Sequence, residues 1–400
     1  MNMNNDRTIL ILYITALSMG LAYGSHAPLI PVFARDILKA NYTEVGFIGM
    51  ANYLPYAFFP FLVGLLLDRV SKLVILLIGI SMATISIAML AIVDNISTLL
   101  LLRAVSGIAH AFFWPSAEAM ISSMNNDGSM SYNNEGNINS NRKGVKNISR
   151  FTMAWVLGYM IGPLLGSYMF KFGYTHLFLY SSIMILPSLA CIIPLLKLHN
   201  VSVVYNSKNV TKIDIKRMRG IIRDRFILIF MIMYYSASFA IVLSILPSYM
   251  NDNSIDEQSI GFLFFIFGVA RLVTLTLVHK IAENKSIVIA NIAIAIAMLM
   301  AYLLTTLYTL TLSMIAFGFA FSVYFPVTLS MLTRGIPFNL IGSIVGLYET
   351  IFGIGWASAP LISGIIADAF GINTPYLLMS ILGLALVPIY TFTFVRYKID

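Results

Sequence analysis

The sequence predicts an all-α membrane protein of twelve transmembrane helices in two pseudo-symmetric six-helix bundles. Of its 400 residues, 59% are hydrophobic and only 10% are charged, whereas about a quarter of the residues in a soluble domain are charged. The apolar residues also form long blocks, such as 8–33, 73–93 and 286–307, which exceed the ~18 residues needed to cross a bilayer. Finally, patterns in the first half of the chain recur in the second.

Charged and Gly/Pro-rich breaks divide the chain into twelve predicted spans. They lie near 8–34, 44–67, 73–93, 98–121, 150–170, 175–196, 226–249, 258–279, 286–307, 310–333, 341–367 and 375–395. The first apolar block is too long for the core of a signal peptide, so we expect it to be a span. Residues 1–196 then form the first bundle and 226–400 the second.

Two polar segments interrupt the spans. Residues 122–149 are rich in Asn, Ser and Gly, which predicts a flexible cytoplasmic loop inside the first bundle. Residues 197–225 hold eight basic residues and predict a basic cytoplasmic loop between the bundles. Within it, 213–225 has the spacing of a basic amphipathic helix on the inner leaflet.

The positions of Lys and Arg predict the orientation. With a cytoplasmic N-terminus, 20 of the 25 Lys and Arg residues fall on the inner side, and the outer loops hold only Arg35, Lys39 and Lys171. This asymmetry predicts that both termini are cytoplasmic. The basic charge then faces anionic lipid headgroups, not nucleic acid. We expect a multi-pass protein of the cell membrane, monomeric and in contact with lipids.

Several chemistries are disfavoured by what the sequence lacks. The single cysteine, Cys191, lies in an apolar block and supports neither a disulfide framework nor a thiolate metal site. There is no P-loop, no GxGxxG after a strand and no HExxH. We therefore expect no enzyme, no metal, no cofactor and no ATPase in this chain.

Three matched sets of residues, in the same order, relate the two halves. Gly107, Ala109 and Pro115 recur 211 positions later as Gly318, Ala320 and Pro326; Gly158 and Pro163 recur 197 positions later as Gly355 and Pro360; Gly46 and Asp68 match Gly261 and Glu283 at a spacing of 215. A parallel repeat of six-helix bundles places a solute site between the bundles near the middle of the membrane.

Three short segments carry motif-like patterns. They are Gly64-Leu-Leu-Leu-Asp68-Arg69-Val-Ser-Lys72, Arg103-Ala-Val-Ser-Gly107-Ile-Ala109 and Gly158-Tyr-Met-Ile-Gly162-Pro163-Leu-Leu-Gly166-Ser167. They resemble three motifs of the major facilitator superfamily: G-x-L-x-D-R-x-G-R-K, R-x-x-Q-G-x-G and G-x-x-x-G-P-x-x-G-G. Ser71, Lys72, Ser106, Ala109 and Ser167 are departures. The third motif is associated with export-type antiporters of that family, so the chain resembles its drug/proton antiporter-like twelve-helix members.

The resemblance implies roles for two groups of residues. Gly64, Asp68, Arg69 and Lys72 would form a cytoplasmic gate that locks the bundles together and breaks when they rock apart; the alternative is a solvated turn. The helix-packing residues would be Gly107, Gly158, Gly162, Pro163 and Gly166, because small residues let helices approach closely.

Arg103 lies about five residues into the fourth predicted span, where a guanidinium requires a partner. It can bind an anionic group of a solute, orient a proton-carrying acid or brace carbonyls of a neighbouring helix. His110 and Trp114 continue the same helix face at i+7 and i+11. His110 can titrate near neutral pH, or it is simply a hydrogen-bonded histidine.

Glu118 and Glu349 are acids inside apolar blocks. A carboxylate at such depth is costly to charge, which is the property of a proton carrier; the alternative is a static buried ion pair. Arg271, in the eighth span, is the candidate partner of Glu349. His26 precedes Pro28 in the outer half of the first span, where we expect a kink, and is a candidate solute or proton ligand.

We therefore expect a secondary transporter that moves a small organic solute by alternating access, with proton-coupled export as the preferred direction. The alternatives are uptake of a sugar, peptide or organic acid, proton-coupled or facilitative, and, in a different class, a solute-sensing membrane receptor.

Overall fold

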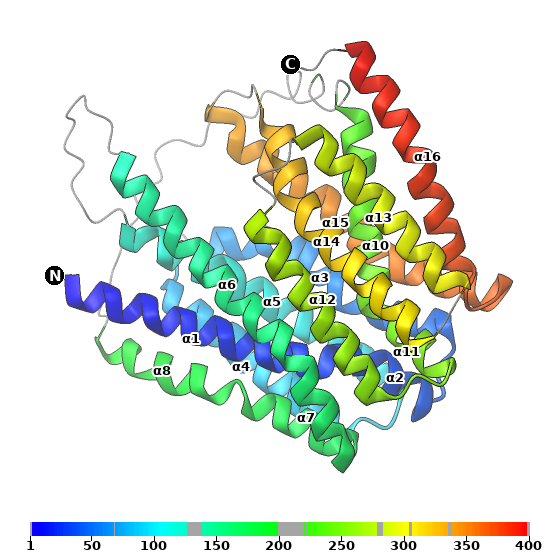
Figure 1. Cartoon of the computed structure of the whole chain (residues 1–400). Helices are drawn as coiled ribbons and strands as arrows, with labels where there is room; N and C mark the ends of the chain where they lie inside the picture. Colours follow the sequence, from blue (N-terminus) through cyan, green and yellow to red (C-terminus); the bar gives the residue numbers. More distant parts are fainter. Residues whose placement is uncertain are drawn as a thin grey trace. The chain divides into compact units, whose positions relative to one another are not determined.

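The computed structural model describes residues 2–67, 69–125, 138–198, 220, 223, 225–277, 283–303, 306–334 and 338–397. In this part of the chain all regular elements are helices, as predicted (Figure 1). They are α1 (Asn2–His26), η1 (Ala27–Leu29), α2 (Ile30–Asp36), α3 (Tyr42–Leu67), α4 (Lys72–Met89), η2 (Leu90–Ile92), α5 (Ile96–Asn125), α6 (Ile138–Met169), η3 (Phe170–Phe172), α7 (Tyr174–Ile183), α8 (Leu186–Leu198), α10 (Phe226–Ser244), α11 (Leu246–Asp252), α12 (Glu257–Leu277), α13 (Glu283–Leu303), α14 (Leu307–Thr333), α15 (Phe338–Phe370) and α16 (Thr374–Tyr397).

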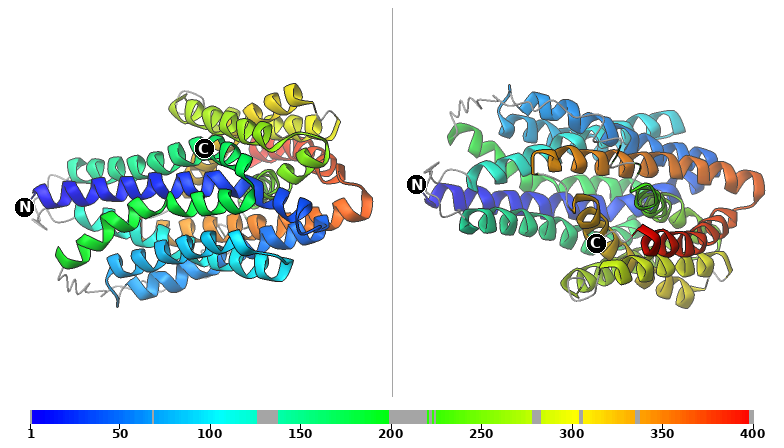
Figure 2. Two further views of the ribbon diagram at one scale, coloured as in Figure 1. Left: turned by 90° about the horizontal axis from the view of Figure 1, so that it is seen from below. Right: turned by 90° about the horizontal axis from the view of Figure 1, so that it is seen from above.

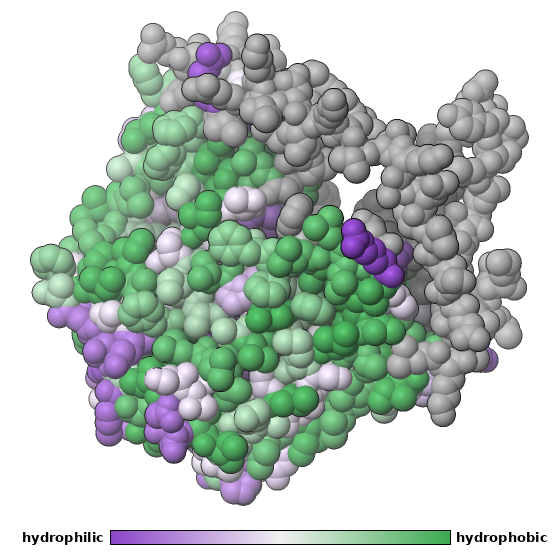
Figure 3. Space-filling view, turned by 180° about the vertical axis from the view of Figure 1, so that it is seen from behind, coloured by the Kyte–Doolittle hydropathy of each residue, from purple (hydrophilic) through white to green (hydrophobic). Residues whose placement is uncertain are grey.

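Eleven helical segments of the described residues are long and apolar enough to cross a membrane. The one predicted span that is not among these eleven, 44–67, corresponds to α3, whose 26 residues reach roughly 39 Å at 1.5 Å per residue. Large apolar side chains remain on the surface, among them Leu101 at 64% and Phe392 at 68% exposure. Figure 3 shows one such face, on which hydrophobic residues cover most of the described surface. Lipid contact is the physical reason for so apolar an exterior.

The first span is broken where its prolines predict a kink. The α-helix ends at His26, a 3-10 turn follows, and α2 begins with Pro31 in its first turn. The seventh span breaks in the same way, because α11 begins with Pro247 in its first turn. Pro31 and Pro247 lie 216 positions apart, so the internal repeat extends to the form of these two helices.

The predicted loop at 122–149 is shorter than expected. Helix α5 continues to Asn125 and α6 already begins at Ile138, because Arg and Lys favour a helix and residues 138–149 contain no proline. Residues 126–137 lie outside the described residues. Most of the central segment 197–225 does so as well, and the predicted boundary between two six-span halves there stays a prediction.

By its internal contacts the chain forms two compact units. Unit 1 takes the described residues of 1–27 and 58–207, and unit 2 those of 28–57 and 208–400. Residues 28–57, in the first half of the sequence, thus pack with helices of the second half. Counting spans cannot reveal this, because the number of helices does not say on which neighbours each helix end packs.

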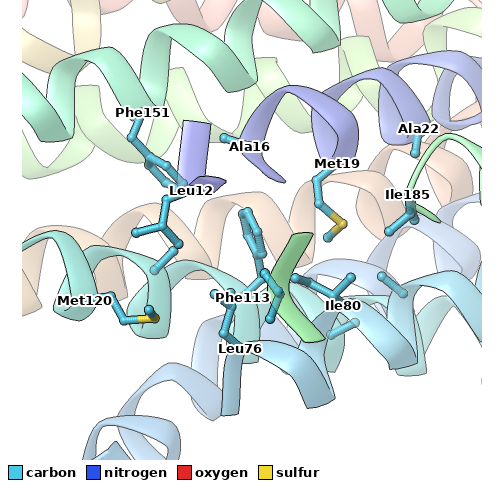
Figure 4. Packing of buried hydrophobic residues seen from close by; sticks show 14 of the residues in the cluster. Leu12, Ala16, Met19, Ala22, Leu76, Ile80, Phe113, Met120, Phe151 and Ile185 are labelled. Carbon is cyan, nitrogen blue, oxygen red and sulfur yellow. The ribbon is translucent and has the colours of Figure 1, made fainter. Parts of the chain in front are cut away.

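In unit 1, α1 and α6 run side by side (Figures 1 and 2). A Cβ atom on Gly158 would collide with backbone atoms of Leu17 and Leu21, and one on Gly162 would lie 2.7 Å from Cα of Gly24. The glycines therefore bring the two backbones into direct contact. Side chains of the same unit fill the space toward α4, α5 and α8; Figure 4 shows Leu12, Met19, Ile80, Phe113 and Phe151 among the fully buried ones.

Unit 2 repeats this helix pair as α10 against α15. A Cβ on Gly355 would collide with the side chain of Ser236 and would lie 2.9 Å from the carbonyl oxygen of Met233. Ser236 and Gly20 are 216 positions apart, and Gly355 and Gly158 are 197 apart. The same close approach thus occurs in both units at equivalent positions. It determines which face of α1 packs against α6 and which face of α10 packs against α15.

Candidate functional site

A cluster of polar and aromatic side chains lies in unit 1, where α1 meets α5 and α6. We call it the polar site; it consists of Tyr23, His26, Arg103, Ser106, His110 and Trp155. The Tyr23 ring lies between two imidazoles, with centroid distances of 3.9 Å to His110 and 5.4 Å to His26. The approach of α1 to α6 at the glycines positions these groups.

Arg103 supplies the positive charge of the polar site. Its side chain is only 7% exposed, and it lies close enough to Tyr23, His26 and His110 to act on all three electrostatically. The Tyr23 hydroxyl is 3.1 Å from the hydroxyl of Ser106, one turn beyond Arg103 on α5. The sequence prediction that Arg103 and His110 share a helix face is consistent with this cluster.

His26 is completely buried. Its Nδ1 lies 2.6 Å from the carbonyl oxygen of Ala22, one turn earlier in α1. A carbonyl can only accept, so Nδ1 carries the proton and, in the neutral ring, Nε2 is left as a hydrogen-bond acceptor. Nε2 of His26 and Nε2 of His110 are both buried and meet no hydrogen-bond partner among the described residues.

One tryptophan belongs to the polar site, and a second tryptophan packs against it. Trp155 of α6 contacts the His110 ring edge-on at 5.6 Å and lies 6.0 Å from the Tyr23 ring. Trp114 contacts Trp155 at 5.0 Å, so it lies in the second layer of the wall. The site therefore combines one guanidinium, two imidazoles and flat aromatic faces.

A second cluster lies in unit 2, around Arg271 of α12. We call it the aromatic site; it consists of Tyr53, Tyr235, Phe239, Phe267, Arg271, Phe321 and Trp356. The guanidinium carbon of Arg271 lies 5.4 Å from the Phe239 ring and 5.5 Å from the Phe267 ring. This is cation–π geometry. Trp356 stacks on Tyr53 at 4.5 Å with an interplanar angle of 12°.

The two sites use equivalent positions for different chemistry. Tyr23 and His110 of the polar site correspond, at spacings of 216 and 211, to Phe239 and Phe321, which contact each other at 4.8 Å. The repeat thus preserves the ring contact and replaces a phenol and an imidazole by two phenyl rings.

Glu349 lies on α15, and its side chain is exposed on the surface of the chain. Both Glu349 and Arg271 lie close enough to Tyr235 to act on it electrostatically. The structure thus brings the predicted acid and the predicted base to the same buried tyrosine. Glu118, also predicted to be functional, is an exposed residue of α5, fifteen positions beyond Arg103.

The predicted cytoplasmic gate is described in part. Asp68 lies outside the described residues. Arg69 is exposed, and the Lys72 ammonium donates a hydrogen bond to the carbonyl oxygen of Ala119 at 3.1 Å. Gly64 has open space around its Cβ position.

A further cluster joins α3 to helices of unit 2 at its predicted outer end. We call it the outer clamp; it consists of Arg35, Tyr42, Thr43, Asp252 and Asp368. The Asp368 carboxylate accepts hydrogen bonds from the backbone N–H groups of Tyr42 and Thr43 at 3.0 and 2.7 Å. Asp252 accepts from the Tyr42 hydroxyl at 2.8 Å and forms a 2.6 Å salt bridge with Arg35.

Sequence reasoning did not identify Tyr23, Trp155, Tyr235 or the outer clamp. Tyr23 could have been found, because it precedes His26 by three residues. It also matches Phe239 at a spacing of 216, the spacing of Pro31 and Pro247. The clamp could not, because its carboxylates come from helix ends far apart in the sequence and resemble ordinary polar loop residues.

Comparison with known proteins agrees with this architecture. The model of the Major Facilitator Superfamily matches residues 12–348 and 228–398. An uncharacterized MFS-type transporter of Methanocaldococcus jannaschii is 24% identical over 385 residues, which cover 93% of this chain and 94% of the relative. The quinolone resistance protein NorA of Staphylococcus aureus is 23% identical over 164 residues, covering 41% of this chain and 38% of NorA.

Solved structures show the same fold. A crystal structure of the nucleoside transporter NupG superposes with a TM-score of 0.80 at 15% identity, covering 96% of this chain and 99% of that one. A POT family transporter in complex with a thioalcohol-conjugated peptide superposes with a TM-score of 0.78 at 10% identity, covering 98% and 97% of the two chains. This chain is a multi-pass membrane transporter that belongs to the Major Facilitator Superfamily.

Proposed function

We propose that the chain is a secondary active transporter that exports a small amphipathic organic solute from the cell in exchange for protons. The observation that carries this proposal is the buried polar site. A guanidinium and two imidazoles inside apolar spans are expensive to place there, and such groups mark solute or ion pathways in membrane proteins. The aromatic site supplies flat apolar surface in unit 2, as an amphipathic solute requires.

The preference for export rests on two features. The segment from Gly158 to Gly166 has the pattern of the fifth-helix motif of export-type members, and it packs against α1 beside the polar site. The similarity to a quinolone resistance protein over 164 residues points in the same direction. We place the protein in the cell membrane as a monomer with both termini in the cytoplasm, on the basis of its Lys and Arg distribution.

Energised membrane vesicles test the direction of transport. Inside-out vesicles expose the cytoplasmic face, so an exporter driven by protons should accumulate added ciprofloxacin, a quinolone, when the lumen is acidic. Vesicles from cells that lack the protein are the control, and collapse of the pH gradient by an uncoupler should abolish accumulation. Uptake in the opposite sense, into right-side-out vesicles from an acidic medium, would identify a proton-coupled uptake permease instead.

A further inference from the structure

The polar site presents two complementary groups at fixed positions. Arg103 offers a positive charge with several N–H donors. Nε2 of His26 is an acceptor, because Nδ1 donates to the carbonyl oxygen of Ala22 at 2.6 Å. The other members of the polar site are the rings of Tyr23, His110 and Trp155 and the hydroxyl of Ser106.

Because His26 is buried, the hydrogen-bond acceptor at its Nε2 cannot be satisfied by bulk water. The side chain is completely buried and Nε2 meets no partner among the described residues. An acceptor buried without a donor is costly, so an arrangement of this kind calls for a ligand group or a water molecule that donates to it. Packing alone does not explain a histidine here, since an apolar side chain would fill the same volume without that cost.

Aromatic rings from α1, α5 and α6 lie beside these polar groups. The Tyr23 ring is held between His26 and His110, and Trp155 contacts both Tyr23 and His110. The hydrogen bond between Tyr23 and Ser106 fixes the phenol toward α5. A planar group can stack on such rings, and aromatic contacts of this kind contribute beyond the apolar area that they bury.

We propose that the polar site binds an organic anion that carries a hydroxyl or N–H donor on a planar group, with the anionic group facing Arg103 and the donor facing Nε2 of His26. The proposal rests on the proposed transport function, because it names the class of solute that the protein would carry. It is tested at equilibrium, so binding and transport can fail separately.

The test measures binding of hydroxybenzoates to the purified full-length protein by quenching of tryptophan fluorescence, since Trp114 and Trp155 lie at the site. The 2-, 3- and 4-hydroxy isomers sample three separations between hydroxyl and carboxylate. Benzoate lacks the donor, and the matching hydroxybenzamides lack the charge. At least one hydroxybenzoate should bind about tenfold more tightly than both controls, the effect expected for one well-placed hydrogen bond to each group.

Two substitutions of His26 separate its two nitrogens. His26→Asn places an amide near Nδ1, which preserves the bond to Ala22 but removes the acceptor, so the preference over benzoate should fall to near unity. His26→Gln reaches the position of Nε2 with an amide oxygen and should retain most of that preference. In Arg103→Gln, a hydroxybenzoate should bind no more tightly than the matching hydroxybenzamide. It should still bind more tightly than benzoate.

The proposal is overturned if benzoate binds wild-type protein as tightly as every hydroxy isomer, if none of these probes binds, or if folded His26→Asn keeps the preference. The wild-type comparison decides the question even where a variant does not fold. If ciprofloxacin is transported along a pH gradient but no hydroxybenzoate is preferred over its controls, only the assigned class of solute is overturned. If a hydroxybenzoate is clearly preferred but no transport occurs, the proposed function is overturned.

Discussion

At the scale of single residues, the hydrogen bond between Tyr23 and Ser106 connects α1 to α5 inside the polar site. Tyr23→Phe removes the hydroxyl and leaves the ring between the two imidazoles. A double-mutant cycle with Ser106→Ala should give a coupling of about 0.5–1.5 kcal/mol in the free energy of unfolding, because a buried hydrogen bond contributes on that order. The measurement is chemical unfolding of the purified protein in detergent. Strictly additive effects of the two substitutions would show that the two hydroxyls do not interact.

The residues of the polar site were predictable only in part. Arg103 and His110 could be selected from the sequence because a guanidinium and an imidazole are rare inside apolar spans. Trp155 carries no such signal, since most aromatic residues in membrane helices simply pack, and Tyr23 is marked only by its position before His26 and by its match to Phe239 in the repeat. Their role follows from the contact of α1 with α6, which brings three helices to one place.

At the scale of helices, the outer clamp holds the beginning of α3. The Asp368 carboxylate accepts from two of the backbone N–H groups that a helix leaves without intrahelical partners. Asp368→Asn keeps the shape and removes the charge, so amide hydrogen exchange at Tyr42 and Thr43 should accelerate by about tenfold. In the control, Asp256→Asn, faster exchange should be confined to the start of α12, where Asp256 accepts from the Ser259 N–H. Unchanged exchange at Tyr42 in Asp368→Asn would contradict the assignment of the clamp.

The contact between α1 and α6 makes a second prediction at this scale. Gly162→Ala places a methyl group against Cα of Gly24, 2.7 Å away, so the helices must separate and thermal stability should fall by several degrees. Gly64→Ala is the matched control for folding, because nothing lies within 4 Å of its Cβ position and alanine favours a helix over glycine by up to about 1 kcal/mol. Equal melting temperatures for the two variants would rule out the close packing of these backbones.

Long, periodic features of the helices were predictable from the sequence, and their ends were not. The break after His26 follows from Pro28 and Pro31, because a proline has no backbone N–H to donate and its ring crowds the preceding turn of a helix. The start of α6 at Ile138 did not follow, because a segment rich in Asn and Ser carries no apolar pattern to distinguish a helix from a loop.

At the scale of the whole molecule, the distribution of Lys and Arg predicts how the chain crosses the membrane. In a Cys191→Ala background, a cysteine at Ser207 should react with a membrane-impermeant maleimide only from the cytoplasmic side. A cysteine at Gln258, an exposed residue at the start of α12, should react only from outside. Labelling of Ser207→Cys in intact cells would show that the chain has the opposite orientation.

The measurement that tests proton-coupled transport most directly is ciprofloxacin flux in proteoliposomes with wild-type protein and Glu349→Gln. Glutamine mimics the protonated acid, so the variant should still exchange labelled for unlabelled ciprofloxacin at close to the wild-type rate. On the hypothesis that Glu349 carries the coupling proton, the variant should fail to accumulate ciprofloxacin against a concentration gradient when a pH gradient is imposed, because glutamine cannot release and rebind a proton. Full gradient-driven accumulation by Glu349→Gln would contradict the account and remove Glu349 as the proton carrier.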